Sequence, residues 1–260
     1  MRRGPILWVM RTYLLEIKYE LLKALRMPQY SLPTLLFPVL FYVFFAVVFA
    51  SGRKAEGINI AEYLIATYGT FGVMGAALFG FGVSVAIERG QGWLEVKRTT
   101  PMPMAAYFVA KMAMAMIFSS IIVILLLVLG VTVGGVQMPL TTMLTLFGTL
   151  VLGSITFCAF GLAIGFLAGP NSAAPIVNLF YLPTAFLAGL WVPIVFLPKP
   201  IQKIAVWLPQ YHFSQLALRT IGGSQNQPIA LHIGAMAAAT LLFAAIAWIG
   251  YRRDEGKLYG

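Results

Sequence analysis

Charged residues are scarce in this chain: Asp, Glu, Lys and Arg make up only 10% of its 260 residues, whereas hydrophobic residues make up 60%. Soluble globular proteins carry about 25% charged and roughly 45–50% apolar residues. Together with a mean hydropathy of +0.87, this shortage of charge excludes an ordinary soluble domain. It also excludes an intrinsically disordered chain, which combines low hydrophobicity with high net charge.

Metal-ligating residues are equally rare. The one cysteine, Cys158, lies in an apolar run, which excludes an internal disulfide and any metal site built from cysteines. His212 and His232 have no carboxylate or cysteine close to them in the sequence. We therefore predict no metal site, and we expect both histidines to form hydrogen bonds near the membrane surface.

Motifs for catalysis are missing as well. The chain has no Gly-x-x-x-x-Gly-Lys-Ser/Thr run, so we expect no ATP site on it. Ser154 has no His or Lys at comparable depth that could activate it as a nucleophile. The long apolar stretches also lack the charged side chains by which ion-coupled transporters generally bind their ions. The chain is therefore not predicted to be an enzyme, and uphill transport would take its energy from another polypeptide.

The charges that are present divide the chain into segments. A net charge of +10 can indicate nucleic-acid binding, but the basic residues here lie in short segments between long uncharged stretches. A membrane-spanning helix needs about 20 apolar residues. We therefore predict an all-α membrane protein, a single domain over residues 1–260 with no nucleic-acid partner. Six transmembrane helices are expected near 31–52, 62–86, 108–133, 141–168, 173–192 and 229–250.

The Lys and Arg residues also predict orientation, because they gather in cytoplasmic loops. With the N-terminus inside, thirteen of the 18 basic residues fall on the cytoplasmic side. We therefore expect both termini to be cytoplasmic and the protein to lie in the cytoplasmic membrane. The basic residues left outside are Arg53, Lys54, Lys199, Lys203 and Arg219.

Two further segments are expected at the membrane surfaces. Residues 1–27 form an amphipathic interfacial helix, because apolar residues such as Met10, Leu14 and Leu21 share one arc and the charged residues occupy the other half. Residues 193–228 are apolar, but four prolines divide them into pieces of about ten residues. Such pieces are too short to span and predict re-entrant or interfacial helices on the outer side.

One cytoplasmic loop, "IERGQGWLEVKRTTPMP" at 87–103, is rich enough to bind a partner. Glu88 and Glu95 are seven residues apart and share a helix face, with Trp93 and Leu94 as apolar contacts. Thr100 and Pro101 end this helix and redirect the chain. By itself the pattern leaves two interpretations open, a docking site and a charged, solvated turn.

The same loop resembles the one between the second and third spans of type 2 ATP-binding cassette exporter permeases. The family shows Glu-Arg, a Gly, an apolar pair, Glu and then Thr-Pro, although Trp93 replaces a residue that is usually small. A second stretch, residues 186–219, is similar to the end of span five and the outer helices of the family. The resemblance extends over essentially the whole chain. The matching positions in the loop are Glu88, Arg89, Gly92, Trp93, Leu94, Glu95, Thr100 and Pro101.

The resemblance implies that the chain is the permease half of an exporter. Two copies would form a homodimer in the lipid bilayer, coupled to two copies of a cytoplasmic ATPase subunit that binds ATP and Mg²⁺. Residues 88–103 would form the coupling loop, with its coupling helix, between spans two and three. The substrate would be hydrophobic or amphipathic, such as a drug, a lipid or a lipid-linked glycan. The alternatives are an ATP-independent secondary transporter and a membrane scaffold.

Two sets of residues are candidates inside the membrane. In the family, spans two and five face the path, which makes Asn178, Tyr181 and Thr184 candidate lining residues by resemblance. Gly161, Gly165 and Gly169 recur at every fourth position, as in helices that approach closely. Their packing within one subunit and a contact between subunits both remain open.

The orientation can be tested by cysteine labelling in a Cys158→Ala background. Ser51→Cys and Ser224→Cys are expected to react with an impermeant thiol reagent added outside intact cells, because both lie in outer loops. Gly256→Cys should not react. Labelling at Gly256 from outside would contradict the six-span orientation.

Overall fold

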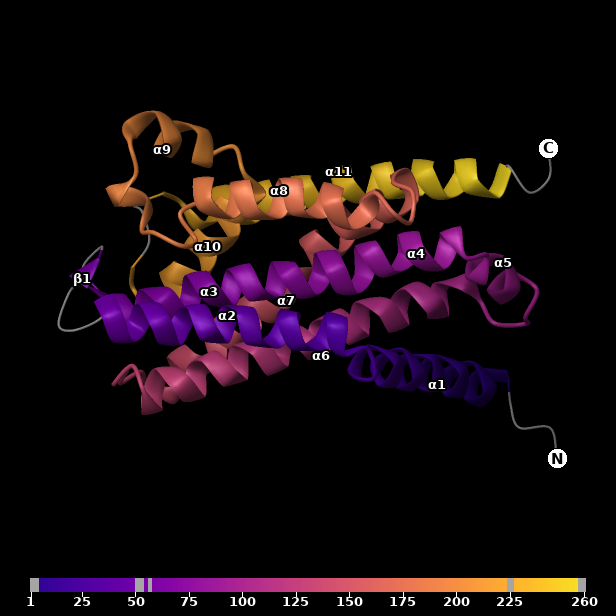
Figure 1. Ribbon diagram of the computed structural model, residues 1–260, viewed down its shortest axis with the longest axis horizontal. Helices are drawn as coiled ribbons and strands as arrows, with labels where there is room; N and C mark the ends of the chain where they lie inside the picture. The colour runs from indigo at the N-terminus through magenta and orange to yellow at the C-terminus, as the bar shows by residue number, and fades with distance from the viewer. Residues whose placement is uncertain (1–4, 50–53, 56–57, 224–226, 257–260) are drawn as a thin grey trace.

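The computed structural model describes residues 5–49, 54–55, 58–223 and 227–256. Helices form almost all of this part of the chain (Figure 1). A two-stranded antiparallel hairpin, β1 (Lys54–Ala55) and β2 (Ile58–Asn59), follows the first long apolar helix. The helices are α1 (Pro5–Leu25), α2 (Pro28–Phe49), α3 (Ile60–Ala77), η1 (Leu78–Val83), α4 (Ser84–Gly90), α5 (Trp93–Arg98), α6 (Met104–Thr132), α7 (Leu140–Leu167), α8 (Ala173–Leu187), η2 (Ile194–Phe196), α9 (Lys199–Ala205), α10 (Pro209–Thr220) and α11 (Ile229–Gly256).

The expected all-α membrane protein is confirmed. Five helices in the described part of the chain are long and apolar enough to cross a membrane. They coincide with five of the six expected spans, although residues 50–52 of the first expected span lie outside the described residues, as do Ser51 and Ser224. The five are Pro28–Ala46, Ile60–Gly90, Met104–Thr132, Leu140–Leu167 and Ile229–Asp254.

The remaining expected span, 173–192, is a shorter helix. α8 has 15 residues and ends at Leu187, below the length of about 20 residues that a straight span needs. Gly189 follows in the left-handed conformation with φ of 76°, and the amide of Leu190 donates to the carbonyl of Ala185 at 3.0 Å. This is the Schellman arrangement that ends helices. The sequence pattern overestimated this span because it counted hydrophobicity and overlooked the glycine stop.

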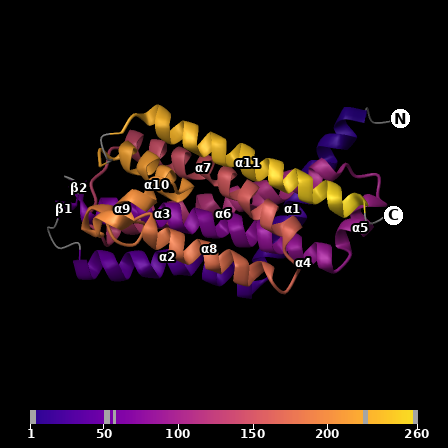
Figure 2. The ribbon, with the colours of Figure 1, turned by 90° about the horizontal axis from the view of Figure 1, so that it is seen from above.

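The buried centre of the bundle is α3, of which 16 residues are inaccessible to solvent. Figures 1 and 2 show α3 enclosed by its neighbours, and it contacts the long helices α2, α6 and α7 and the shorter α10. Its many small residues permit this close packing on several sides. At Gly69, for example, an added side-chain carbon would lie 2.7 Å from a methyl group of Leu150.

The helix that starts as α3 contains one irregular turn. η1 is a π-helix of six residues, continuous with α3 before it and α4 after it. Gly82 in this turn lies against the backbone of α7, where an added side-chain carbon would be 2.5 Å from the carbonyl oxygen of Gly161. Gly165 lies against the carbonyl oxygen of Gly82 in the same way. Glycines on both helices therefore allow the π turn to touch α7 directly.

The segment 193–228, which was expected on the outer side and is here called the outer segment, consists of short helices, as the prolines predicted. η2, α9 and α10 each begin directly after, or at, a proline. They lie at the end of the bundle opposite α5, as Figure 1 shows. α10 buries most of its length against α3, α7 and α11. The described part of the segment, 193–223 and 227–228, is therefore attached firmly to the spans.

Two histidines join this outer segment to α11. His212 Nδ1 lies 2.9 Å from His232 Nδ1, and His212 Nε2 donates to the carbonyl oxygen of Val206 at 3.0 Å. Because Nε2 of His212 carries the proton, its Nδ1 accepts from His232 when both rings are neutral. The expected hydrogen bonding of the two histidines is confirmed.

The amphipathic helix α1 presents its two faces in an unexpected way. Its apolar residues Met10, Leu14 and Leu25 are exposed, whereas Glu20 is buried. The sequence predicts a charged half in water, but part of that half packs against α6, where Lys111 pairs with Glu20. The apolar half remains free to contact lipid.

The histidine pair predicts a pH dependence for the outer segment. Burial lowers the pKa of His212 below its usual value, so the folded state favours the neutral ring. The stabilisation is fully present above the usual pKa of about 6.5 and is lost as the pH falls toward the lowered value. The protection factors of the α10 amides, which are corrected for the slower intrinsic exchange at low pH, are expected to fall between pH 7.5 and 5.5. In His212→Gln, whose amide can still bond Val206, the change should be smaller; an equal change would contradict this assignment.

Candidate functional site

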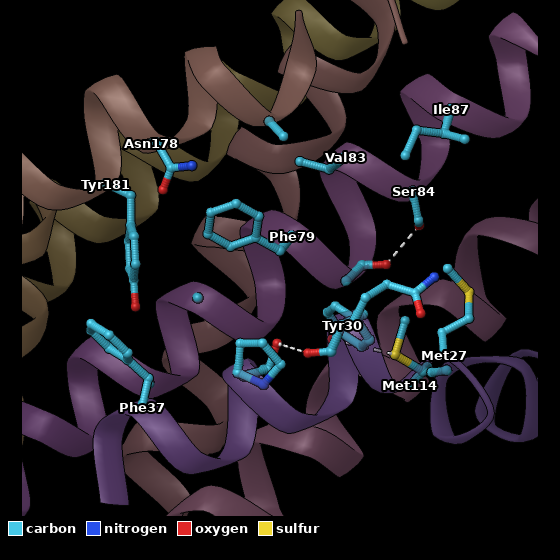
Figure 3. A pocket seen from close by; sticks show the side chains of 18 of the residues that line it. Met27, Tyr30, Phe37, Phe79, Val83, Ser84, Ile87, Met114, Asn178 and Tyr181 are labelled. Atoms are coloured by element: carbon cyan, nitrogen blue, oxygen red, sulfur yellow. Dashed lines mark hydrogen bonds between the residues drawn. The ribbon is translucent and has the colours of Figure 1, made fainter. Parts of the chain in front are cut away.

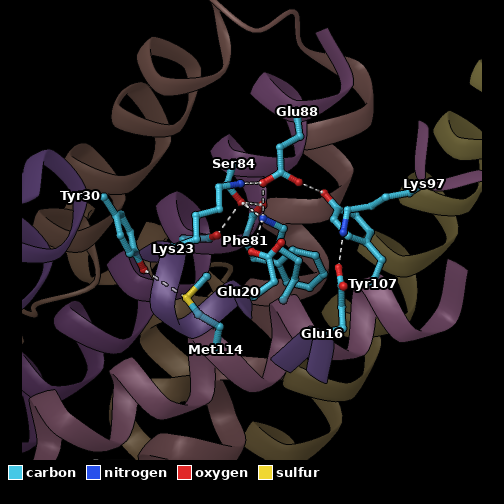
Figure 4. A network of polar contacts seen from close by, with 12 residues as sticks. Glu16, Glu20, Lys23, Tyr30, Phe81, Ser84, Glu88, Lys97, Tyr107 and Met114 are labelled. Carbon is cyan, nitrogen blue, oxygen red and sulfur yellow. Dashed lines mark hydrogen bonds and ion pairs between the residues drawn. The ribbon is translucent and has the colours of Figure 1, made fainter. Parts of the chain in front are cut away.

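A cluster of buried charges joins three helices at the end of the bundle that contains α5 (Figure 4). Lys111 of α6 is 1% exposed and Glu88 of α4 is 4% exposed. The ammonium of Lys111 lies 2.6 Å from Glu88 Oε1 and 2.8 Å from Glu20 Oε2 of α1. Lys23 of α1 pairs with the same Glu88 oxygen. The four residues Glu20, Lys23, Glu88 and Lys111, here called the ion cluster, balance two positive charges with two negative charges.

Polar neighbours complete the coordination of the ion cluster. The hydroxyl of Tyr107 donates to Glu88 Oε2 at 2.7 Å, and Lys111 donates to the hydroxyl of Ser84 at 3.1 Å. Lys97 of α5 pairs with Glu16 of α1 and lies 5.0 Å above the Tyr107 ring. Because every charge has an opposite partner, the desolvation of these groups is compensated locally.

A second set of contacts fixes the other side of the same loop. Arg89 donates to the carbonyl oxygens of Phe166 and Ala168, at 2.5 and 2.7 Å, where α7 ends. Asp254 of α11 lies 3.5 Å from Arg89 and 3.8 Å from Arg98. Arg89 thus satisfies carbonyl groups that the end of a helix leaves without intrahelical donors, and it connects α4 with α7 and α11.

The predicted coupling residues therefore separate into buried and exposed groups. Glu88 and Leu94 are buried, and Arg89 is half-buried in contacts within the chain. Trp93 is 54% exposed, and Glu95 and Val96 on the same short helix are exposed as well. Gly92 has φ of 78°, a conformation that favours glycine, and turns the chain from α4 into α5. The sequence predicted that Glu88 and Glu95 share one charged helix face, but in the structure Glu88 is buried.

A cavity of about 660 Å³ begins at the ion cluster and extends between α2, η1 and α8 (Figure 3). Its polar end contains Glu20, Lys23 and Lys111, and its apolar walls include Phe37 and Phe79. The volume lies within the range of about 300–1,000 Å³ that is typical of small-molecule sites. Because the walls are mainly apolar and one end is charged, the cavity matches an amphipathic ligand.

The structure places two of the three predicted path residues at this cavity. Asn178 and Tyr181 of α8 line it. The Tyr181 ring stacks on Phe71 at 4.5 Å, and its hydroxyl donates to the carbonyl oxygen of Phe71 at 2.9 Å. Thr184 does not line the cavity; its hydroxyl accepts from Gln210 of α10 at 3.0 Å. The turn of α8 between Tyr181 and Thr184 therefore separates the cavity from the outer segment.

Of the three glycines predicted to pack against a neighbouring helix, two do so and one does not. Gly161 and Gly165 lie against η1 of the same chain, so they form the contact within one subunit that was one of two open interpretations. Gly169 follows the end of α7 and has only the hydroxyl of Ser172 near it, at 3.5 Å. A repeat of four residues does not place Gly169 on the packed face because the helix has already ended.

Sequence reasoning missed the ion cluster. Lys111 is one of the basic residues assigned to the cytoplasmic side, at the edge of the expected span 108–133, but it lies two turns inside α6. A lysine within an apolar helix requires a buried partner, and the acids Glu16 and Glu20, spaced by four on α1, provide the matching signal. Among the described residues, no group of three or more His, Cys, Asp or Glu side chains could hold a metal ion.

The comparisons with known proteins agree with this architecture. Residues 12–221 match the family model described as "ABC-2 type transporter". The chain belongs to the ABC-2 type transporter family. It is 29% identical over 238 residues to "Putative transport permease YvfS" of Bacillus subtilis (strain 168), covering 91% of this chain and 95% of that protein. It is 30% identical over 159 residues to "Probable multidrug ABC transporter permease YbhR" of Escherichia coli (strain K12), covering 60% of this chain and 42% of that one.

Membership of the ABC-2 family defines the general role. The chain is a multi-pass membrane subunit of an ABC transporter, a permease, and the family implies an ABC ATPase as its partner. The family match includes the loop at 88–103, so the family that this loop resembles is confirmed.

The buried position of Glu88 predicts a loss of stability when it is removed. In Glu88→Ala, Lys23 loses this partner and Lys111 keeps only Glu20, and breaking a buried ion pair costs about 3–5 kcal/mol. We expect a clearly lowered Tm for the purified variant. Glu95→Ala is the matched control, because this acid is exposed on α5 and its loss should leave Tm unchanged. Equal Tm values for Glu88→Ala and the wild type would show that the cluster is not stabilising.

Proposed function

We propose that this permease is the membrane half of an ATP-driven exporter for hydrophobic or amphipathic molecules such as drugs, lipids or lipid-linked glycans. Two copies form a homodimer, and two ATPase subunits, which hold ATP and Mg²⁺, bind on the cytoplasmic side. One observation supports this most directly. The exposed apolar side chains of α5, Trp93 and Val96, lie at the same end of the bundle as the ion cluster, and the ion cluster borders the amphipathic cavity.

The coupling helix in this proposal is α5. Trp93 and Val96 project from it as exposed apolar side chains beside the exposed Glu95, which suits a cleft on a partner protein. Glu88, Arg89, Gly92 and Leu94 do not make this contact but hold α5 in position. Lys97 connects α5 to α1 through Glu16. A push on α5 is thereby passed to α1, α4 and α6 together.

The transport path in this proposal begins at the cavity. Asn178 and Tyr181 line it from α8, and Thr184 lies beyond it at the contact with α10. α8 acts as the fifth of six spans, and the outer segment with α9 and α10 is re-entrant and covers its outer end. Such irregular backbone is tolerated in a membrane where protein encloses it.

The orientation follows from the basic residues and the position of the termini. The first residues of α1 and the last of α11 lie at the same end of the molecule as α5 (Figure 1). We place this end in the cytoplasm and the protein in the cytoplasmic membrane, since the majority of the Lys and Arg residues lie there.

Two tryptophan variants, Trp93→Ala and Trp207→Ala, test the role of α5 in this proposal. Trp93→Ala removes the main apolar contact of α5 and is expected to abolish, or reduce at least tenfold, transport and assembly with the cognate ABC ATPase. Its Tm should stay unchanged, because the side chain is exposed. Trp207→Ala is the matched control: it removes a side chain that is 84% exposed next to α9 at the opposite end. Both variants are measured as complexes co-expressed with the ATPase and reconstituted in vesicles.

The alternatives give different results in the same vesicles. Transport that persists without ATP and without the ATPase would indicate a secondary transporter. A complex in which the permease changes neither transport nor ATPase activity would indicate a scaffold. Native mass spectrometry of the wild-type complex should give two permeases and two ATPases; a single permease per complex would contradict the homodimer.

A further inference from the structure

The charge of the ion cluster and the depth of the cavity together indicate which kind of ligand the cavity can bind. We propose that the cavity binds an anionic amphiphile from the inner leaflet, with its phosphate or carboxylate head at Lys23 and its apolar tail along α2 toward Pro38. This inference rests on the proposed function for the direction of transport, whereas binding itself is a property of the permease.

The depth of the cavity corresponds to one leaflet. On α2 its lining runs from Gln29, in the first turn, to Pro38, near the middle of the helix. At 1.5 Å per residue this distance is about 14 Å, and half of the hydrocarbon core of a bilayer is about 15 Å. The charged end lies beside α1 and the apolar end near the centre of the bundle. A molecule with a polar head and an apolar tail fills this shape in one direction only.

The head group is assigned from the accessibility of the charges. The Lys23 side chain is 44% exposed and lines the cavity, whereas the side chains of Glu20, Glu88 and Lys111 are 7%, 6% and 1% exposed. The most exposed of these charges is therefore an ammonium; Glu20 also lines the cavity but is buried in its pair with Lys111, and Glu88 does not line it. A cationic head would meet Lys23 first and be repelled.

The pairing within the ion cluster permits Lys23 to change partner. Lys111 contacts Glu88 at 2.6 Å and Glu20 at 2.8 Å, so both carboxylates keep a cation when Lys23 turns to a ligand. An anion near Lys23 gains a charge-assisted hydrogen bond, while Lys111 remains in contact with both carboxylates. The ligand would also weaken the link between α1 and α4, which makes the α1–α4 contact dependent on occupancy.

The apolar part of the site accepts a tail. Phe37, Phe79 and Met114 line the wall beyond the ion cluster, and Pro33 and Pro38 lie within α2 on the same side. Proline lacks the backbone N–H and contributes an apolar ring. Asn178, which is exposed to the cavity, is the polar group of α8 along this wall.

The test uses three probes with the same tail and different heads: dodecyl phosphate, dodecylphosphocholine and dodecyltrimethylammonium. Binding is measured by isothermal titration to the permease in nanodiscs, without the ATPase. We expect dodecyl phosphate to bind at least tenfold more tightly than dodecyltrimethylammonium. Lys23→Gln should remove this preference and Lys23→Arg should retain it. Lys18→Gln is the matched control, because Lys18 is on α1 but does not line the cavity.

The binding measurements can overturn the proposed head-group site in two ways. Equal binding of the three probes, or a preference that survives in Lys23→Gln, would overturn the proposed head-group site. If Lys23→Gln fails to fold, the wild-type comparison and the Lys23→Arg variant still decide the question. In the reconstituted complex, dodecyl phosphate should stimulate ATP hydrolysis. Charge-selective binding without any stimulation would leave the site in place and contradict the proposed exporter function instead.

Discussion

The salt bridges between Glu88 and the two lysines of the ion cluster determine how the helices at the α5 end of the permease are assembled. They connect α1, α4 and α6, which are separate in sequence, through the buried Glu88 and Lys111 and the partly exposed Lys23. Buried ion pairs contribute little net stability compared with apolar packing, but an unpaired member is very costly. The cluster therefore restricts these helices to arrangements in which the charges still meet. The exposed surface of α5, the cavity and the position of α1 all depend on that restriction.

Most of the fold was predictable because the bilayer imposes simple rules. Uncharged stretches of sufficient length predicted five of the long helices, and prolines predicted the short outer helices η2, α9 and α10. The end of α8 was not predicted, since a Schellman turn at Gly189 depends on one backbone conformation. The π turn η1, in which Gly82 lies against the backbone of α7, was also not predicted. Both features depend on local backbone geometry that hydrophobicity does not encode.

The site was predicted less completely than the fold. The loop motif located α5 and its exposed Trp93, and the resemblance directed attention to Asn178 and Tyr181, which do line a cavity. The burial of Glu88 was missed, because a glutamate next to an arginine in a short loop looks like a solvated charge. Its partners Lys23 and Lys111 lie 65 and 23 positions away from it in the sequence. The roles of these residues in coupling and transport remain predictions.

The shortness of α8 has a consequence for the barrier that a transported molecule must cross. Fifteen residues extend about 22 Å, compared with a hydrocarbon thickness of about 30 Å. A span of this length would cause hydrophobic mismatch, which bilayers relieve by thinning unless protein replaces the missing length. At its outer end the missing length is replaced by protein, because Thr184 bonds Gln210 of α10. In the proposed exporter, a tail that leaves the cavity along α8 would therefore meet α10, and not lipid, beyond the end of this helix.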